Sequence, residues 1–347
     1  MNKIELTYSP YKLNLTKPFE TSKNIISERK GFLIQLRSSL GKVGIGDAAP
    51  LPELGSEKFE DDEAALKNIK LKFKLDLALI ESNISQILSP YEKLPALKHG
   101  IEQALINLIC KEKKYSLNEL FNKTSRKEIK VNAVIGFLTP NESAKTASEL
   151  ISEGFQTIKV KVGRKLFDED LKCLKEIRKA VGNKIKIRID VNGKWKLSEA
   201  VNNLEKLKSL DLEYIEQPVK SLKDFIELSK MTSIPLAVDE SIKNEKDAKN
   251  FILKKAASVL ILKPMLLGGI IPTINIIRLA EENEIKVVIS SSFESVIGRS
   301  MTIFAASIVK DEIAHGLATG IYFEKDLAAD PYKVKNGKIN LEIDKGF

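Results

Sequence analysis

From about residue 131 onward, short apolar runs alternate with longer stretches in which apolar residues recur at helical spacing. Successive runs end roughly 25 residues apart, which is room for a strand, a loop and a helix. We predict eight strands: VNAVIGF (131–137), FQTIKVKVG (155–163), IKIRIDVNG (185–193), LEYIEQP (212–218), IPLAVDES (234–241), SVLILKP (258–264), KVVISSS (286–292) and IAHGLAT (313–319). Such strands form a parallel sheet that closes naturally into a (β/α) barrel, with an open doubly wound sheet as the alternative.

The first 125 residues follow a different pattern. MNKIELTYSPYKLNL and GFLIQLRSS alternate as antiparallel strands do, and helical stretches follow them. We expect an α+β capping domain over 1–125 and a barrel domain over 126–319. The stretch YKVKNGKINLEI has an Asn-Gly turn, so residues 320–347 are expected to complete the capping domain as a hairpin. The glycines of KVGIGDAAP nearly match a dinucleotide fingerprint, but Pro50 follows and no helix opens, which favours a surface loop.

Composition narrows the functional classes. The chain has 347 residues and a net charge of +9, but its lysines are scattered and lack the motifs of nucleic-acid-binding proteins. A small anionic substrate suits the charge equally well. We see no apolar run that could insert into a membrane and no signal peptide. The two cysteines, Cys110 and Cys173, lack metal-ligand spacing and indicate buried, reduced thiols in a cytoplasmic protein.

Charged residues stand where five consecutive predicted strands stop. Lys159 and Lys161 lie two residues apart in TIKVKVG (157–163), so their side chains point to the same face. The next four strands end in Asp190, in Glu216, in Asp239 with Glu240, and in Lys263. Any one of these could be an ordinary turn or cap residue. On a barrel, however, the carboxyl ends of the strands form one ring, and these side chains would meet near one point.

Three converging carboxylates repel one another strongly unless a cation lies between them. Oxygen ligands with open positions suit Mg²⁺, whereas zinc is disfavoured because no histidine or cysteine joins the set. A lysine beside another cation has a lowered pKa and can accept a proton near neutral pH. The residues therefore predict proton abstraction next to a substrate carboxylate, with a metal ion stabilising the resulting enediolate.

This pattern resembles the enolase superfamily. K-x-K on the second strand, D…E…D on strands three to five and K on the sixth are similar to its muconate-lactonizing subgroup. The resemblance covers nearly the whole chain and implies an α/β, enolase-like fold, a modified (β/α)7β TIM-like barrel with an α+β capping domain. It implies that Asp190, Glu216 and Asp239 bind Mg²⁺, for which Mn²⁺ could substitute, and that Lys161 and Lys263 are the acid/base pair.

Within the subgroup, four stretches are similar to the o-succinylbenzoate synthase family: GDAAPLPELG, IEQP, SSSFESVIG and HGLATGIYFEKDLAAD. This resemblance implies dehydration of 2-succinyl-6-hydroxy-2,4-cyclohexadiene-1-carboxylate to 2-succinylbenzoate in menaquinone biosynthesis. It implies that Lys161 removes the α-proton and then protonates the departing hydroxyl, while Lys263 stabilises the anion. Lys159 would tune Lys161 or play a structural part.

Other residues are expected to support the metal ligands or to bind the substrate. Arg188 either meets a substrate carboxylate in a forked contact or balances the carboxylate ring. Asn192 either supports the metal or makes the Asn-Gly turn. Glu240 is expected beside the metal ligands, and Ser291 and Ser292 are expected to bind substrate. By resemblance, the loops at 17–30 and 46–56 close over the substrate, although Asp47 stands where related sequences commonly carry Glu.

Three related activities stay open: dipeptide epimerisation, N-acylamino acid racemisation and muconate cycloisomerisation. Dipeptide epimerases typically carry D-x-D on the eighth strand to hold the substrate ammonium, and this chain reads GLATG there. A non-enzymatic binding protein would not need five aligned charges, and metal-dependent activity would separate it from the enzymes. The oligomeric state is not readable from the sequence.

Overall fold

The computed structural model describes residues 4–20, 25–69 and 80–341. Residues 21–24 of the expected lid, 1–3 and 70–79 of the expected capping domain, and 342–347 of the tail lie outside this part of the chain. Within the described residues, no helix is both long enough and apolar enough to cross a bilayer.

The larger unit is a sheet of seven parallel strands, hydrogen-bonded in the order β11-β10-β9-β8-β7-β6-β5. Its strands are β5 (Ala133–Ile135), β6 (Thr157–Lys161), β7 (Lys186–Asp190), β8 (Leu212–Glu216), β9 (Leu236–Val238), β10 (Val259–Leu262) and β11 (Lys286–Ile289). These strands lie within seven of the predicted runs and confirm the parallel arrangement. The strand in the first predicted run, β5, is shorter than expected. The residues just before that run form β4 (Glu128–Lys130), which belongs to another sheet.

The eighth predicted strand, residues 313–319, is not a strand. The chain makes only single parallel bridges there, from His315 to Val131 and from Gly316 to Ser290, and then enters the 3-10 helix η5 (Ala318–Tyr322). These two bridges span the gap between the two edges of the sheet. The His315 N–H donates to Lys130 O at 2.9 Å and the Gly316 N–H donates to Ile289 O at 2.9 Å. The barrel wall is therefore completed by individual backbone bonds and not by a ladder.

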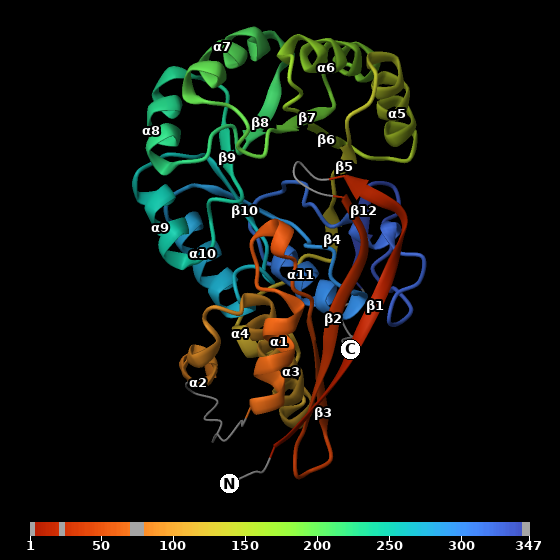
Figure 1. The fold of residues 1–347 in the computed structure, drawn as a ribbon, viewed down its shortest axis with the longest axis vertical. Coiled ribbons are helices and arrows are strands. Elements are labelled where there is room, and N and C mark those ends of the chain that lie inside the picture. The colour runs from red at the N-terminus through yellow and green to blue at the C-terminus, as the bar shows by residue number, and fades with distance from the viewer. Residues whose placement is uncertain (1–3, 21–24, 70–79, 342–347) are drawn as a thin grey trace.

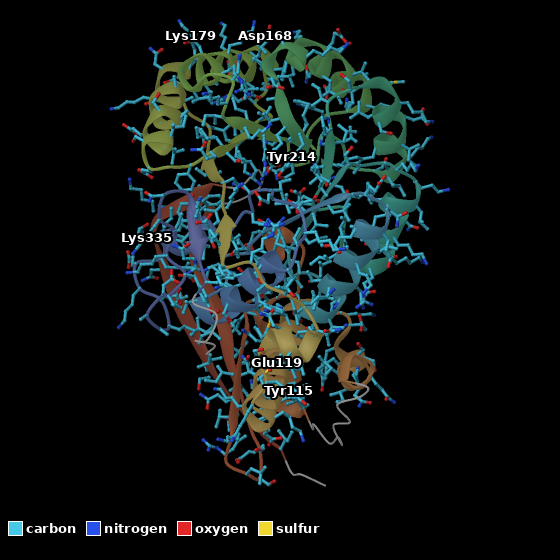
Figure 2. All side chains as sticks on the ribbon, turned by 180° about the vertical axis from the view of Figure 1, so that it is seen from behind. Tyr115, Glu119, Asp168, Lys179, Tyr214 and Lys335 are labelled. Atoms are coloured by element: carbon cyan, nitrogen blue, oxygen red, sulfur yellow. The ribbon has the colours of Figure 1, made fainter. Side chains whose placement is uncertain are left out.

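Amphipathic helices cover the outer face of the sheet, and Figure 1 shows them as an arc around the strands. They are α5 (Pro140–Ser152), α6 (Phe167–Val181), α7 (Leu197–Leu207), the 3-10 helix η4 (Lys208–Leu210), α8 (Leu222–Met231), α9 (Glu245–Leu253), α10 (Ile270–Glu282) and α11 (Val296–Ser307). In Figure 2 Asp168 and Lys179 of α6 project outward, whereas Tyr214 lies inside the barrel. Tyr214 belongs to a separate apolar cluster with Val259, Ile261 and Val288, which fills the barrel interior below the site.

The cap is built on a three-stranded antiparallel sheet, β1 (Glu5–Glu20), β2 (Ile25–Arg37) and β3 (Val43–Ala48). Its helices are η1 (Pro52–Leu54), α1 (Phe59–Asn68), α2 (Ile80–Leu88), η3 (Ser89–Tyr91), α3 (Pro95–Lys113) and α4 (Leu117–Phe121). The two predicted antiparallel strands are thus confirmed. Figure 1 shows the hairpin of β1 and β2 running along one side of the molecule toward β5.

The interpretation of KVGIGDAAP as a surface loop is wrong, because residues 43–48 form β3, which packs against α3. A Cβ atom on Gly44 would lie 2.0 Å from Ala104 O, and one on Gly46 would lie 1.9 Å from Gly100 O. The glycines let a strand and a helix approach closely, which is a packing role and not phosphate binding.

Helix α11 joins the two units. Nearly all of its residues are buried, as expected for a helix with protein on every side, and it contacts β3, α3 and β11. At its N-terminus, the Ser295 N–H and Oγ donate to the Asp47 carboxylate of β3 at 3.0 and 2.7 Å. In the same way, Glu102 of α3 accepts hydrogen bonds from the Ile270 and Ile271 N–H groups at the start of α10. Two carboxyl groups of the cap therefore accept hydrogen bonds at the N-terminal ends of two barrel helices.

The Asn-Gly turn predicted in the tail is confirmed. Asn336 and Gly337 have φ angles of 51° and 67°, and Lys335 and Lys338 exchange two backbone hydrogen bonds across them. After the turn, β12 (Lys338–Asn340) pairs with β4, while Phe323 makes a bridge to Leu15 of β1. The described tail thus contacts the cap sheet and the segment that leads into the barrel.

Candidate active site

A cavity of about 630 Å³ lies where the cap meets the carboxyl ends of the barrel strands. The cap lines it with Phe19 and residues 52–55. The barrel lines it with the following polar side chains: Lys159, Lys161, Asp190, Asn192, Asp239, Glu240, Lys243, Lys263, Ser290, Ser291 and Thr319. Most residues that the sequence places at strand ends therefore line one cavity.

The two lysines of β6 point to the same side, as alternation predicts, and both bond to carboxylates. Lys161 Nζ lies 2.7 Å from Asp190 Oδ2 and 3.0 Å from Asn192 Oδ1. Lys159 Nζ lies 2.9 Å from Glu216 Oε1 and 3.1 Å from Asp190 Oδ2. Burial opposes the charge of Lys159, but Glu216 and Asp190 outweigh it and raise the pKa of Lys159 well above its ordinary value. The pKa of Lys159 thus shifts in the direction opposite to the lowering expected for a lysine beside another cation.

The carboxylates differ in their surroundings. Burial would raise the pKa of Asp190, but Lys161 and Lys159 together bring it below its ordinary value. Burial, followed by the charge of Asp190, raises the pKa of Glu216 to about 8. Lys263 bonds to Asp239, and although burial lowers the pKa of Lys263, Asp239 and Glu240 raise it overall. The site is a dense network of opposite charges in a place largely shielded from water.

The expected metal ligands lie on neighbouring strands, but they are not assembled around one point. Asp190 and Glu216 are paired residues of β7 and β8, and Asp239 directly follows β9. Within residues 4–20, 25–69 and 80–341, no three acidic, histidine or cysteine side chains are placed to share a metal ion. The ammonium groups of Lys159 and Lys263 contact these carboxylates instead. The metal site therefore stays a prediction.

Two observations nevertheless fit a divalent cation. Lys159 Nζ contacts both Asp190 and Glu216, so one positive charge can reach both carboxylates. Among the described residues, the buried Glu216 Oε2 and Glu240 Oε2 atoms have no hydrogen-bond partner. Free carboxylate oxygens are the donors that Mg²⁺ prefers.

Of the two roles that the sequence leaves open for Asn192, the structure shows the turn, and support of a metal ion stays a prediction. Its φ of 49°, followed by 68° at Gly193, makes the turn after β7. Its side chain also accepts from Lys161 and donates to Glu240 Oε1 at 2.7 Å. Asn192 thus links the candidate base to the acidic residue beside Asp239.

Arg188 does not line the cavity and is fully buried one layer below it. Its guanidinium donates to Glu213 at 2.5 Å and to Ala314 O at 2.8 Å, and lies 4.7 Å from the Tyr214 ring centroid. Neither expected role fits this position: its carboxylate partner is Glu213 and not the strand-end ring, and a substrate in the cavity is out of its reach. An inward-facing strand position alone does not tell which layer of a barrel a long side chain occupies.

Ser291 and Ser292, the two serines expected to bind substrate, are not equivalent. Ser291 lines the cavity, but its hydroxyl already bonds to Glu294, and it accepts from Thr319 Oγ1 at 2.7 Å. Ser292 is buried outside the lining, where its N–H donates to Glu294 and its hydroxyl has no partner among the described residues. Of these two serines, Ser291 is the one placed to meet a substrate.

The expected lid segments are largely regular structure. Residues 25–30 belong to β2, and Arg29 donates to the backbone oxygens of Phe293, Pro50 and Ala49, which fastens the cap to the barrel. Residues 46–48 belong to β3, where Asp47 is buried and accepts from Tyr11 at 2.6 Å. Asp47 is therefore a docking residue, while residues 52–55 of the second segment do reach the cavity.

Sequence reasoning missed an aromatic wall and a glutamine. Phe19, Phe293 and Tyr322 line the cavity together, with ring centroids 4.7 to 5.8 Å apart. They come from three distant segments, so no local pattern joins them. Gln217 lies between two acidic strand ends, and its place in IEQP was the available signal.

Residues 142–347 match the family model described as "Enolase C-terminal domain-like". The chain belongs to this family. Solved structures agree with the expected enolase-like fold: the L-Ala-D/L-Glu epimerase from Bacillus subtilis superposes with a TM-score of 0.88 at 24% identity, covering 98% of this chain and 96% of that one. The dipeptide epimerase from Enterococcus faecalis, complexed with Mg and the dipeptide L-Leu-L-Tyr, has a TM-score of 0.87 at 25% identity over 98% of this chain and 97% of that one.

Curated relatives of this enolase-like chain have different activities. The o-succinylbenzoate synthase of Thermobifida fusca is 35% identical over 209 residues, covering 59% of this chain and 64% of that protein. The N-succinyl-L-Arg/Lys racemase of Bacillus cereus is 27% identical over 95% of this chain and 90% of that protein. Protein PHYLLO of Arabidopsis thaliana is 28% identical over 93% of this chain, which spans only 21% of PHYLLO. Membership in the enolase C-terminal domain-like family is thus compatible with more than one reaction.

Proposed function

We propose that this chain is an o-succinylbenzoate synthase that dehydrates a cyclohexadiene carboxylate bearing a succinyl chain. One observation carries the choice within the family. The segment that completes the barrel gives the cavity Gly316, Ala318 and Thr319 and no carboxylate, so a substrate ammonium group finds no acidic partner there. The similarity to the Thermobifida fusca synthase supports the same choice.

Asp190, Glu216 and Asp239 are the residues that would hold Mg²⁺ in this proposal. The ion supplies positive charge where the substrate carboxylate becomes more negative as its α-proton leaves. Its net charge also offsets the mutual repulsion of the three carboxylates. Mn²⁺, which accepts the same oxygen ligands, is a suitable probe.

Lys161 is the proposed base. In its neutral form, Nζ takes the proton from the α-carbon, and the electron pair of that C–H bond moves toward the substrate carboxylate to give an enediolate anion. The pair then forms the new ring double bond as the C–O bond to the hydroxyl breaks, the same Nζ returns its proton to that oxygen, and water leaves. Asp190 and Asn192 hold Nζ in place, because they contact it at 2.7 and 3.0 Å. Lys263 keeps its charge and stabilises the anion from its own strand end.

A racemase of N-succinyl amino acids is the second candidate. It would use the same two lysines on opposite sides of the α-carbon, and it is favoured by the Bacillus cereus relative, which aligns over most of both chains. The two activities need the same cation and the same base. Dehydration requires a hydroxyl leaving group on the substrate, whereas racemisation does not.

The first prediction tests this function directly. Purified protein with Mg²⁺ is assayed with the succinyl cyclohexadiene carboxylate, an N-succinyl amino acid and a dipeptide. We expect dehydration to have the highest kcat/KM, and Lys161→Ala to lower kcat by at least about 10³-fold because the base is lost. Lys186→Ala is the matched control, since Lys186 is an exposed lysine at the start of strand β7, and the cavity lies at the carboxyl ends of the strands. Near-normal dehydration by Lys161→Ala, or a clear preference for another substrate, would reject the assignment.

A further inference from the structure

Gln217 directly follows Glu216 and is almost completely buried, with 2% of its surface exposed. Its φ of 43° lies in the left-handed region, which is unfavourable for a residue with a side chain. A strained backbone of this kind persists only where surrounding bonds hold it.

Every hydrogen-bonding group of Gln217 is used, and the partners come from neighbouring strand ends. Side-chain Oε1 accepts from the Asp239 N–H at 2.9 Å, and Nε2 donates to Val219 O at 2.8 Å and to Ser241 Oγ at 2.7 Å. The backbone N–H donates to Ala237 O at 2.8 Å. The backbone oxygen accepts from the Gly193 N–H at 2.6 Å. One residue therefore ties together the ends of β7, β8 and β9.

Asp239 depends on this contact more than Asp190 and Glu216 do. Asp190 and Glu216 are ladder residues, and each is paired with its neighbour strand. Strand β9 ends at Val238, so Asp239 lies beyond the ladder. Its N–H is bonded to the Gln217 amide oxygen and not to a neighbouring strand. The side chain of the residue next to Glu216 thus holds the backbone of Asp239, from which the Asp239 carboxylate extends.

We propose that Gln217 is a positioning residue, which holds Asp239 in a fixed relation to Glu216 so that both carboxylates can bind one divalent cation. The proposal rests on the proposed function, because that function requires the cation. Residues that orient metal ligands typically change metal affinity 10- to 100-fold when they are replaced.

The second prediction uses Mn²⁺ titrations of the metal-free full-length protein, followed by electron paramagnetic resonance. Gln217→Met keeps the length of the side chain and removes its hydrogen bonds, and we expect it to weaken Mn²⁺ binding about 10- to 100-fold. Gln217→Gly suits the positive φ and also lacks the amide, so it should fold and show the same loss. Thermal unfolding with a chelator present measures the stability of each variant without metal.

Gln103→Met is the matched control. Gln103 is also a buried glutamine, and its amide accepts from the Asp47 N–H at 3.0 Å and donates to Ile297 O at 2.7 Å, away from the acidic strand ends. We expect it to lower stability without changing Mn²⁺ affinity. If the wild type binds Mn²⁺ and both Gln217 variants bind equally well, the positioning role is wrong and the proposed function stands. If the wild type binds no Mn²⁺ at millimolar concentration, the proposed function and this inference both fail.

Discussion

At the residue scale, His99 is buried among apolar groups. It belongs to α3, has no exposed surface, and neither ring nitrogen has a hydrogen-bond partner among the described residues. Burial lowers its pKa to about 4. In the unfolded chain a histidine takes up a proton near pH 6.5, so the unfolded state binds that proton first as the pH falls. The neutral ring therefore stabilises the fold above pH 6.5, and this contribution is lost on acidification toward pH 4.

The third prediction follows from this shift. Replacing His99 by leucine, which is of similar size, removes the titrating group and two unpaired nitrogens. We expect His99→Leu to be at least as stable as the wild type at pH 8, and more stable by about 3 kcal/mol at pH 4. Urea unfolding at both pH values measures the difference. An advantage that is equal at both pH values would show that titration of His99 plays no part.

Single residues show what a sequence can and cannot predict about a site. Lys161, Asp190 and Lys263 could be found because each ends an apolar run, and strand ends converge on a barrel. The partners of Arg188 could not be found, since they come from strand β8 and from the closing segment. Gln217 could not be found either, although acidic strand-end residues surround it. Its proposed role depends on which backbone N–H its side chain meets, and the sequence does not show this.

At the scale of single elements, α10 illustrates capping from another domain. Its first N–H groups bond to Glu102 of α3, and Gly269 leaves room for that carboxyl, because a Cβ there would lie 2.2 Å from Glu102 Oε1. Burial raises the pKa of Glu102 to about 8, although the two helix N–H groups lower it and Lys98 lowers it further. The folded state thus holds the proton more tightly than the unfolded state, and stability is lost as the pH rises from about 4.5 to 8.

The fourth prediction is that Glu102→Gln removes this loss. The variant stays neutral and keeps an acceptor for α10, so its stability relative to the wild type should increase between pH 5 and pH 8 by up to several kcal/mol. Glu119→Gln is a control that should show little change relative to the wild type between pH 5 and pH 8. Glu119 caps α4 at the surface, and its hydrogen bonds to Ser116 lower its pKa, so its contribution is lost only as the pH falls below this range. Guanidinium unfolding at pH 5 and pH 8 compares the two, and parallel pH dependences would contradict the prediction.

Most of the barrel strands could be predicted from the sequence, but residues 313–319 and strand β3 were predicted incorrectly. Seven of the eight predicted runs contain strands, because buried parallel strands are short and nearly continuously apolar. Residues 313–319 have the same apolar character, but Gly316 and the turn into η5 limit them to two bridges. Strand β3 was missed because its glycines face a helix, and a sequence does not show which glycines are closely packed.

At the scale of the whole molecule, one continuous apolar core joins cap and barrel. Ile101 of α3 and Trp195 of the barrel belong to the same cluster of buried residues. The cap's docking contacts also reach the barrel at three places, through Arg29, Asp47 and Glu102. We therefore expect the cap and the barrel to unfold together in one cooperative transition.

The fifth prediction uses the single tryptophan as a reporter. Trp195 is the only tryptophan of the chain and lies in the barrel, 5.5 Å from Phe167 in ring-centroid distance. Ile101→Ala removes a fully buried side chain from the cap and should cost about 2–5 kcal/mol. We expect the unfolding midpoint reported by Trp195 fluorescence to shift as far as the one reported by circular dichroism. An unchanged Trp195 midpoint would mean that the barrel unfolds independently of the cap.

The overall architecture could be predicted from the sequence because the pattern that indicates it recurs along the chain. Each strand and helix pair adds an independent sign of a parallel barrel, and the antiparallel cap stands out by contrast. How the two units meet was not accessible, since it depends on single long-range contacts such as that between Arg29 and Phe293.

The contact between Asp47 and Ser295 spans 248 positions of the chain. At a synthesis rate of roughly 5 to 20 residues per second, Ser295 is made roughly 12 to 50 s after Asp47. During that interval the strands of the cap sheet have been synthesised, but the helix end that Asp47 caps has not. We therefore expect docking of the cap to be a late event in biogenesis, and the nascent cap to be the stage at which the growing chain most needs protection from misassociation.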